Sequence, residues 1–240
     1  MLLRLAAQLL WPARCAACNA FVPENSAFCE SCELSVSAVE QACHGCGLPH
    51  TNDDRGGSSR CHGCQARPLP FSRVWTVLAY GGATTQAILH LKHGRRRHLA
   101  RPLGALLAPA VADAIENGVD ALCPVPLHPR RLRQRGFNQA LELLRVAEKL
   151  SRRPAARALV VSDGLRRIRD TPALGWESPA SRRRIVAGAF AMPRPQWAQG
   201  RRILLVDDVM TTGATLAECA RVLLKAGATE VHVVALARVA

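Results

Sequence analysis

The sequence predicts an α/β fold, in which a mainly parallel sheet flanked by helices follows a small cysteine-rich region. Two observations carry this prediction. Eight of the ten cysteines lie before residue 65, whereas segments with strand and helix periodicity alternate beyond residue 67. Strands that alternate with helices favour a parallel sheet. We therefore expect two domains in the chain of 240 residues, residues 1–66 and residues 67–240.

Element boundaries follow from the spacing of apolar residues. Short apolar runs bounded by polar residues, Gly or Pro predict strands, and apolar residues three or four positions apart predict helices. A polar, arginine-rich loop is expected over residues 163–184. The predicted strands are 73–80, 119–126, 156–161, 201–209 and 230–239, and the predicted helices are 84–92, 99–116, 138–150 and 215–228.

The first fourteen residues are expected to form an amphipathic helix that packs on the body of the protein. The apolar run is short, is interrupted by Arg4, and lacks the small-residue cleavage pattern of a signal peptide, which is the minor alternative. No apolar run approaches the length needed to cross a bilayer. We therefore expect a cytoplasmic protein without a membrane span.

The chain is strongly basic, because 32 Lys and Arg residues against 18 Asp and Glu residues give a formal net charge of +14. This balance favours polyanionic partners such as nucleic acid or phosphorylated small molecules. A composition shaped by a GC-rich genome is the alternative, although the arginines are clustered along the chain. Aromatic residues make up only 4% of the sequence, so a dedicated base-stacking platform is not indicated.

Eight cysteines form four C-x-x-C pairs. The two-residue spacer lets both thiolates of a pair turn toward one tetrahedral ion, and nothing in the sequence favours secretion, so structural zinc is a better explanation than disulfides. Two sites of four thiolates are expected, with the pairs combined in chain order or interleaved, and His44 and His62 are alternative ligands. The expected ligands are Cys15, Cys18, Cys29, Cys32, Cys43, Cys46, Cys61 and Cys64.

The strongest functional signal is I-L-L-V-D-D-V-M-T-T-G-A-T, residues 203–215. Asp207 and Asp208 follow a buried strand, at the end where parallel sheets bind ligands. The amides that begin the next helix, with a glycine for close approach, are typical of a phosphate site. A ribose 5-phosphate fits both the acidic pair and the amides. Its ring hydroxyls donate hydrogen bonds to the carboxylates, and its phosphate accepts hydrogen bonds from the amides. The expected phosphate-binding residues are Thr211, Thr212, Gly213, Ala214 and Thr215.

These thirteen residues resemble the phosphoribosyl-pyrophosphate (PRPP) motif of type I phosphoribosyltransferases at every defining position. Together with H-x-x-R-L-x-x-R-G-F-N-Q (128–139), residues 79–104 and the four cysteine pairs, they make nearly the whole chain look like the ComF family. The resemblance implies a type I phosphoribosyltransferase-like domain with a double zinc ribbon, PRPP and Mg²⁺ as ligands, catalytic roles for Asp207 and Asp208, and an association with DNA uptake and natural transformation.

The end of the predicted 119–126 strand, the arginines that follow it and a lysine at the end of the predicted 84–92 helix are candidates for contact with pyrophosphate or with a nucleic-acid backbone. For the arginines a solvated basic loop is the alternative, and for the lysine a solvated helix end. The candidates are Pro126, Arg130, Arg131, Arg135 and Lys92.

Two further polar residues in this segment have simpler explanations. Asn138 is expected to cap the following helix. His128 is a candidate base by location only, and a role in a loop or a helix cap is favoured for it.

The 167–190 region resembles the flexible loop that closes over PRPP, with Arg169 and Arg182 in the family pattern. Two positions depart from that pattern, because Leu174 stands where a Gln is usual and Ile185 where an Asn is usual. The loss of polar side chains from a closing loop is expected to impair catalysis while PRPP binding is retained.

Two functional hypotheses follow from the sequence. In the first, the protein is an enzyme that transfers the phosphoribosyl group of PRPP to an unidentified nitrogen acceptor. In the second, the zinc ribbon and arginine surface hold single-stranded DNA and DNA-uptake proteins are partners, while the pocket is silent or regulatory. Only the first hypothesis requires Asp207 and Asp208.

Overall fold

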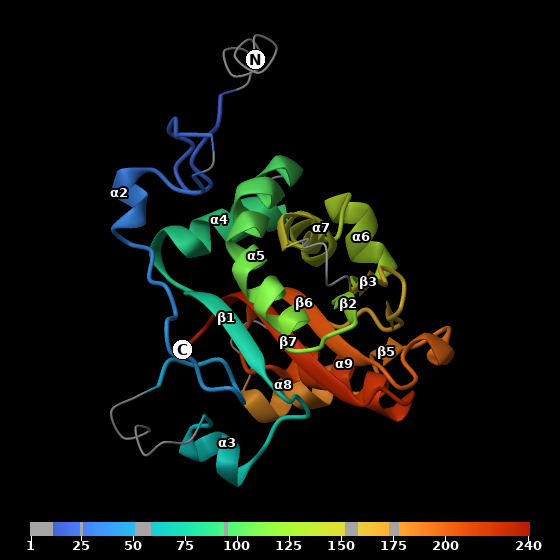
Figure 1. Ribbon diagram of the computed structural model, residues 1–240. Helices are drawn as coiled ribbons and strands as arrows, with labels where there is room; N and C mark the ends of the chain where they lie inside the picture. Colours follow the sequence, from blue (N-terminus) through green and yellow to red (C-terminus); the bar gives the residue numbers. More distant parts are fainter. Residues whose placement is uncertain (1–11, 25, 51–58, 94–95, 152–157, 173–177) are drawn as a thin grey trace.

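A five-stranded, fully parallel sheet forms the centre of the computed structural model, which describes residues 12–24, 26–50, 59–93, 96–151, 158–172 and 178–240 (Figure 1). The predicted parallel sheet is thereby confirmed. In spatial order its strands are β1 (Val74–Ala79), β7 (Glu230–Arg238), β6 (Arg202–Met210), β2 (Ala121–Pro124) and β3 (Leu159–Val160).

The middle strand, β6, marks the place where the order of strands reverses. From β6 the chain passes through α9 (Ala214–Lys225) to β7 on one side, whereas β2 lies on the other side and is followed by β3 at the edge. Ligands on parallel sheets bind beyond the carboxyl ends of the strands at such a reversal. The fold therefore directs attention to the loops that follow β6 and β2.

Helices cover both faces of the sheet, because successive side chains of each strand point to opposite faces. Leu204 and Val206 of β6 pack with α4 (Gly82–His93), α5 (Ala100–Glu116) and α7 (Gln139–Ser151). Ile203 and Leu205 pack on the other face with α9, against which α8 (Pro179–Val186) lies. The core thus forms two layers around buried strands.

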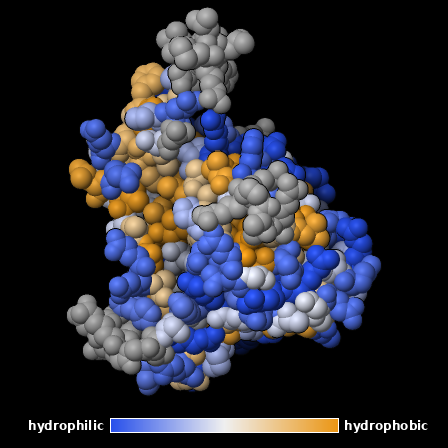
Figure 2. Space-filling model, in the orientation of Figure 1, coloured by the Kyte–Doolittle hydropathy of each residue, from blue (hydrophilic) through white to orange (hydrophobic). Residues whose placement is uncertain are grey.

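The cysteine-rich region lies along β1, the edge strand opposite β3 (Figure 1). Ala38 forms an antiparallel bridge with Leu78, and the Val74 amide donates to the His44 carbonyl at 2.9 Å. Two short helices belong to this region, α2 (Glu30–Glu33) and α3 (His62–Ala66). Figure 2 shows an apolar patch over α2 and α4 on a largely hydrophilic face, and Leu34 is 92% exposed.

The prediction of a loop over residues 163–184 is wrong, because this range contains a strand and a helix. β4 (Arg166–Arg167) pairs antiparallel with β5 (Phe190–Ala191), and α8 begins at Pro179 with the Ser178 hydroxyl accepting from the Ser181 amide at 3.2 Å. Helix α8 could not be predicted from the sequence, because only Val186 of this helix is buried. Its residues therefore show almost no apolar periodicity. The further elements are α6 (Pro129–Arg135) and the 3₁₀ turns η2 (Arg97–Leu99) and η3 (Pro195–Trp197).

Several sequence predictions lie outside the described residues. These are most of the N-terminal amphipathic helix, the first part of the strand expected at 156–161, and Leu174. Of the helices in the described ranges, none has the length and apolarity required to traverse a bilayer.

Candidate functional site

Asp207 and Asp208 lie in the last part of β6, in different surroundings. Asp208 is buried, and its Oδ2 lies 3.0 Å from Nζ of Lys92, which α4 brings over the sheet. Asp207 is partly exposed, and its Oδ1 accepts the Asp208 amide at 2.9 Å. Burial, followed by the charge of Asp208, raises the pKa of Asp207 well above its ordinary value, and Lys92 opposes this rise. Of the two carboxylates, Asp207 is therefore the more accessible to solvent.

The turn after β6 has the geometry of an anion site. Gly213 has φ +75° and is the N-cap of α9, and a Cβ built on it would lie 2.8 Å from Cε of Met210. The first amides of a helix have no partner within the helix and attract anions. The Thr212 hydroxyl oxygen is buried without a hydrogen-bond partner in the structure. Thr211, Thr212 and Thr215 stay partly exposed, so ligands can reach this turn.

The end of β2 lies directly beside the acidic pair. Pro124 is in register with Val206, and the Val125 amide donates to the Val206 carbonyl at 2.9 Å. Asn138 donates to the Val125 carbonyl at 3.0 Å, and its Oδ1 accepts the Ala140 amide at 3.0 Å. The predicted capping role of Asn138 is confirmed, and the same side chain fastens the start of α7 to the end of β2.

Pro126 follows this strand and lines a cavity of about 590 Å³. The walls of the cavity come from α6, the start of α7 and residues 162–168, and they do not include residues 207–215. The structure therefore places Pro126 in the wall of a hollow that the turn after β6 does not line.

Of the candidate basic residues, Lys92 and Arg135 are the two associated with the acidic pair. Burial lowers the pKa of Arg135, whereas the charges of Asp208 and Asp207 oppose this change, so the guanidinium lies within electrostatic reach of both carboxylates. Its Nη1 donates to Oε1 of Gln139 at 2.5 Å, an interaction that helps to fix its position.

The arginines at the start of α6 contact a different segment. Arg130 Nη1 lies 3.2 Å from the Asp170 carboxylate, and Arg131 donates to the Thr171 carbonyl at 2.6 Å. His128 caps α6 by accepting the Arg130 amide at 3.4 Å and lies 3.7 Å from Asp170. The favoured capping role of His128 is confirmed, and α6 holds the 169–171 segment in place.

The two residues expected in a closing loop are also held by local structure. Arg169 donates to the Ala187 carbonyl at 2.6 Å. Arg182 lies in α8, one turn before the partly buried Ile185. The family position filled by Ile185 is thus on a helix that packs against α9.

Two clusters of four cysteines meet the requirements of zinc sites. Within each cluster the sulfur atoms lie within 4.8 Å of one another, and the 18–29 and 46–61 pairs are 3.5 and 3.8 Å apart. Tetrahedral Zn–S bonds of about 2.3 Å place sulfurs about 3.8 Å apart. The pairs combine in chain order, which excludes the interleaved arrangement, and neither cluster includes a histidine. The clusters are Cys15, Cys18, Cys29 and Cys32, and Cys43, Cys46, Cys61 and Cys64.

None of the ten cysteines forms a disulfide, so disulfides do not explain the four pairs. In the second cluster Cys43 Sγ accepts the amides of Gly45 at 3.3 Å and Cys61 at 3.1 Å. Amide donors to sulfur stabilise thiolate ligands. With four thiolates on each ion no coordination position remains for water, and the zinc is structural.

The fold and the cysteine clusters define a phosphoribosyltransferase-like domain that carries a double zinc ribbon. Residues 6–67 match the double zinc ribbon domain, and residues 169–240 match the phosphoribosyl transferase domain. DNA utilization protein YhgH of Escherichia coli is 35% identical over 217 residues, which cover 88% of this chain and 89% of that protein.

Competence proteins of two other bacteria are also similar. Competence protein F of Haemophilus influenzae is 30% identical over 233 residues, covering 94% of this chain and 96% of that protein. Competence protein ComFC of Bacillus subtilis is 32% identical over 109 residues, covering 44% and 39%. The chain belongs to the ComF family.

Sequence reasoning missed two charged contacts at the site. One is the Lys92–Asp208 ion pair, which joins residues 116 positions apart. The other is the buried Arg238, which contacts the carbonyls of Met210 and Cys46. A signal for Arg238 was present, because a lone arginine in the apolar run 231–239 must find internal partners.

Proposed function

We propose that this protein binds PRPP with Mg²⁺ at the turn after β6 and transfers the phosphoribosyl group to a nitrogen acceptor. One observation carries the proposal. A partly exposed carboxylate, Asp207, and the N-terminus of α9 lie together where the strand order of a parallel sheet reverses. A sugar phosphate has a diol for the first group and an anion for the second.

Each residue of the turn has a role in this proposal. The α9 amides and the hydroxyls of Thr211, Thr212 and Thr215 hold the 5′-phosphate, and Gly213 lets the backbone approach it. Asp207 accepts hydrogen bonds from the ribose hydroxyls. Lys92 neutralises Asp208, which keeps the two adjacent carboxylates compatible with an anionic ligand.

In the reaction, the bond between C1 of the ribose and the pyrophosphate oxygen breaks, and a bond from the acceptor nitrogen to C1 forms. Pyrophosphate leaves with the electron pair, and the acceptor nitrogen releases a proton. The transition state resembles an oxocarbenium ion, so the negative charge of Asp207 stabilises the growing positive charge on the ring. Mg²⁺ would be held mostly by the pyrophosphate, the ribose hydroxyls and water, and it would supply positive charge to the leaving pyrophosphate.

Titration calorimetry with PRPP and Mg²⁺ tests the binding step. We expect saturable binding by the wild-type protein and at least about a tenfold loss of affinity for Asp207→Ala. Undetectable binding by the wild-type protein contradicts the proposal. A screen for pyrophosphate release against bases and amines then tests the transfer step and identifies the acceptor.

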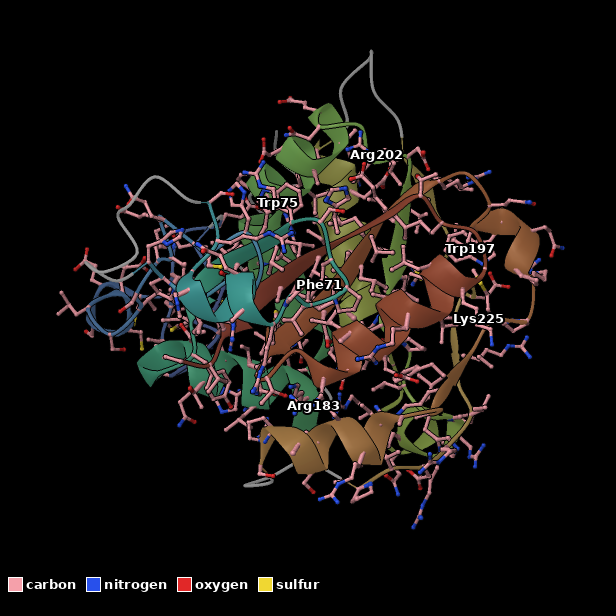
Figure 3. All side chains as sticks on the ribbon, turned by 90° about the horizontal axis from the view of Figure 1, so that it is seen from below. Phe71, Trp75, Arg183, Trp197, Arg202 and Lys225 are labelled. Atoms are coloured by element: carbon pink, nitrogen blue, oxygen red, sulfur yellow. The ribbon has the colours of Figure 1, made fainter. Side chains whose placement is uncertain are left out.

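A second function is favoured by the surface of α8. Arg183 and Arg184 are exposed there, and Figure 3 shows Arg183 on this helix in the lower part of the view. The similar proteins are named for DNA utilization and competence. We propose that this basic surface binds single-stranded DNA through its phosphates. Because this role does not need the acidic pair, Asp207→Ala separates the two functions.

A further inference from the structure

Arg238 is a buried cation at the carboxyl end of β7, 7% exposed. Its Nε donates to the carbonyl oxygen of Cys46 at 2.7 Å, and its Nη1 contacts the carbonyl oxygens of Met210, at 3.2 Å, and Thr211. Cys46 belongs to the second cysteine cluster, whereas Thr211 begins the 211–215 turn. One guanidinium therefore connects a zinc site to the proposed phosphate-binding turn.

Apolar side chains also connect the second cysteine cluster to the 211–215 turn. Leu69 packs against the second cysteine cluster and also against the core layer that contains Met210. A Cβ built on Gly213 would lie 3.6 Å from Cδ1 of Leu69 and 3.9 Å from Cζ of Phe71. Figure 3 shows Phe71 between α3 and α9. The apolar residues behind the turn thus lie just after the zinc ribbon in the chain, and Leu69 links the turn to the second cysteine cluster.

Electrostatics indicate why a charged residue is stable at this place. Four thiolates on one Zn²⁺ carry a net charge of about −2, which complements a nearby guanidinium. The guanidinium of Arg238 also donates hydrogen bonds to the carbonyl groups of Met210 and Thr211. These carbonyls lie where β6 ends, so neighbouring strands do not supply all of their hydrogen bonds.

We propose that Arg238 is a positioning residue that holds the 211–215 turn against the second zinc site, so that zinc at this site, and not at the first, maintains the order of the turn. The inference rests on the proposed function for the ligand of the turn. Its subject is the order of the backbone, which can be measured without any ligand.

Hydrogen–deuterium exchange of the zinc-loaded protein tests the role of Arg238. For Arg238→Lys we expect amides of residues 211–215 to exchange at least about tenfold faster, while the amides in the middle of β6 and β7 stay protected and two zinc ions per chain are retained. Lysine keeps the charge but loses the fork. Arg221→Lys, the same change on the exposed face of α9, is the matched control. Unchanged exchange of the turn in Arg238→Lys overturns the proposal.

Removal of one zinc at a time is a second test of the proposal. This test remains available if Arg238→Lys does not fold. Cys61→Ser removes a ligand of the second site, and Cys18→Ser removes one of the first. We expect faster exchange of residues 211–215 only in Cys61→Ser, with one zinc per chain in both variants. Equal exchange of the turn in the two variants contradicts the proposal.

Calorimetry with PRPP and Mg²⁺ separates this inference from the proposed function. If the wild-type protein binds PRPP, Arg238→Lys is expected to bind it at least about tenfold more weakly than Arg221→Lys. If the wild-type protein does not bind PRPP, the proposed function fails, whereas the exchange measurements still confirm or contradict the role of Arg238.

Discussion

Two adjacent carboxylates of β6 differ in what they do for the folded protein. Asp208 is buried and paired with Lys92 at 3.0 Å, so its charge has a partner. Among the described residues no cation forms an ion pair with Asp207, and burial and the charge of Asp208 raise its pKa. A carboxylate whose charge destabilises the folded protein is typical of a group that is retained for function.

This difference predicts opposite effects of two conservative changes. At pH 7 we expect Asp207→Asn to raise the free energy of unfolding by about 1 kcal/mol, because a destabilising charge is removed. We expect Asp208→Asn to lower it by about 2 kcal/mol, because Lys92 is left without its partner. Urea unfolding of the zinc-loaded proteins measures both changes, and destabilisation by Asp207→Asn would refute this assignment.

The pH dependence of stability provides an independent check on Asp207. Because its folded-state pKa is raised, the folded chain retains a proton that the unfolded chain has released above about pH 4. The contribution of this group to the free energy of unfolding therefore falls as the pH rises from about 4 toward the folded-state pKa. We expect the difference in stability between Asp207→Asn and the wild type to grow over this range and to vanish below it.

At the scale of elements, the first zinc ribbon is joined to α4, the helix that carries Lys92. The Ser35 hydroxyl accepts the Ala83 amide at 3.1 Å, and a Cβ built on Gly82, whose φ is +46°, would lie 2.5 Å from the Ser35 carbonyl oxygen. His90 Nδ1 lies 3.0 Å from the Ala16 carbonyl oxygen. The position of α4 therefore depends on the ribbon.

Gly82→Ala is expected to destabilise the protein by about 2 kcal/mol, because it adds left-handed backbone strain to a clash with the ribbon. Gly81→Ala is the matched control, since a Cβ there meets nothing within 4 Å, and its effect is expected to stay within about 0.5 kcal/mol. Urea unfolding compares the two variants. Similar losses in both would show that the contact between the ribbon and α4 does not determine stability.

Elements with local signals were predictable, and those that depend on distant contacts were not. The apolar run that forms β6, its acidic pair and the four C-x-x-C spacings are visible in short stretches of sequence, so the sheet and both zinc sites followed from them. β4 and β5 are only two residues each and exist through pairing with one another. Arg238 and Cys46 are 192 positions apart, and no local pattern reports such a contact.

For the molecule as a whole, positive charge is the property most directly related to nucleic acid. The formal net charge is +14, and many arginines are already paired, as Arg97 is with Glu142 at 2.8 Å. Exposed arginines at consecutive positions of α8, such as Arg183 and Arg184, are therefore a better guide to a binding surface than net charge. Figure 2 shows hydrophilic residues over much of one face, in keeping with a charged exterior.

Binding of single-stranded DNA to this surface is expected to weaken with salt, because bound phosphates release counterions. For a double variant, Arg183→Glu with Arg184→Glu, we expect weaker binding and a decrease of about 1.4 in the slope of log affinity against log salt, about 0.7 for each lost phosphate contact. Arg145→Glu with Lys149→Glu, on α7, makes the same change of charge elsewhere and controls for the general field. Fluorescence anisotropy with a labelled oligonucleotide at several salt concentrations measures both slopes. If both double variants shift the slope equally, binding follows net charge and α8 is not the DNA-binding surface.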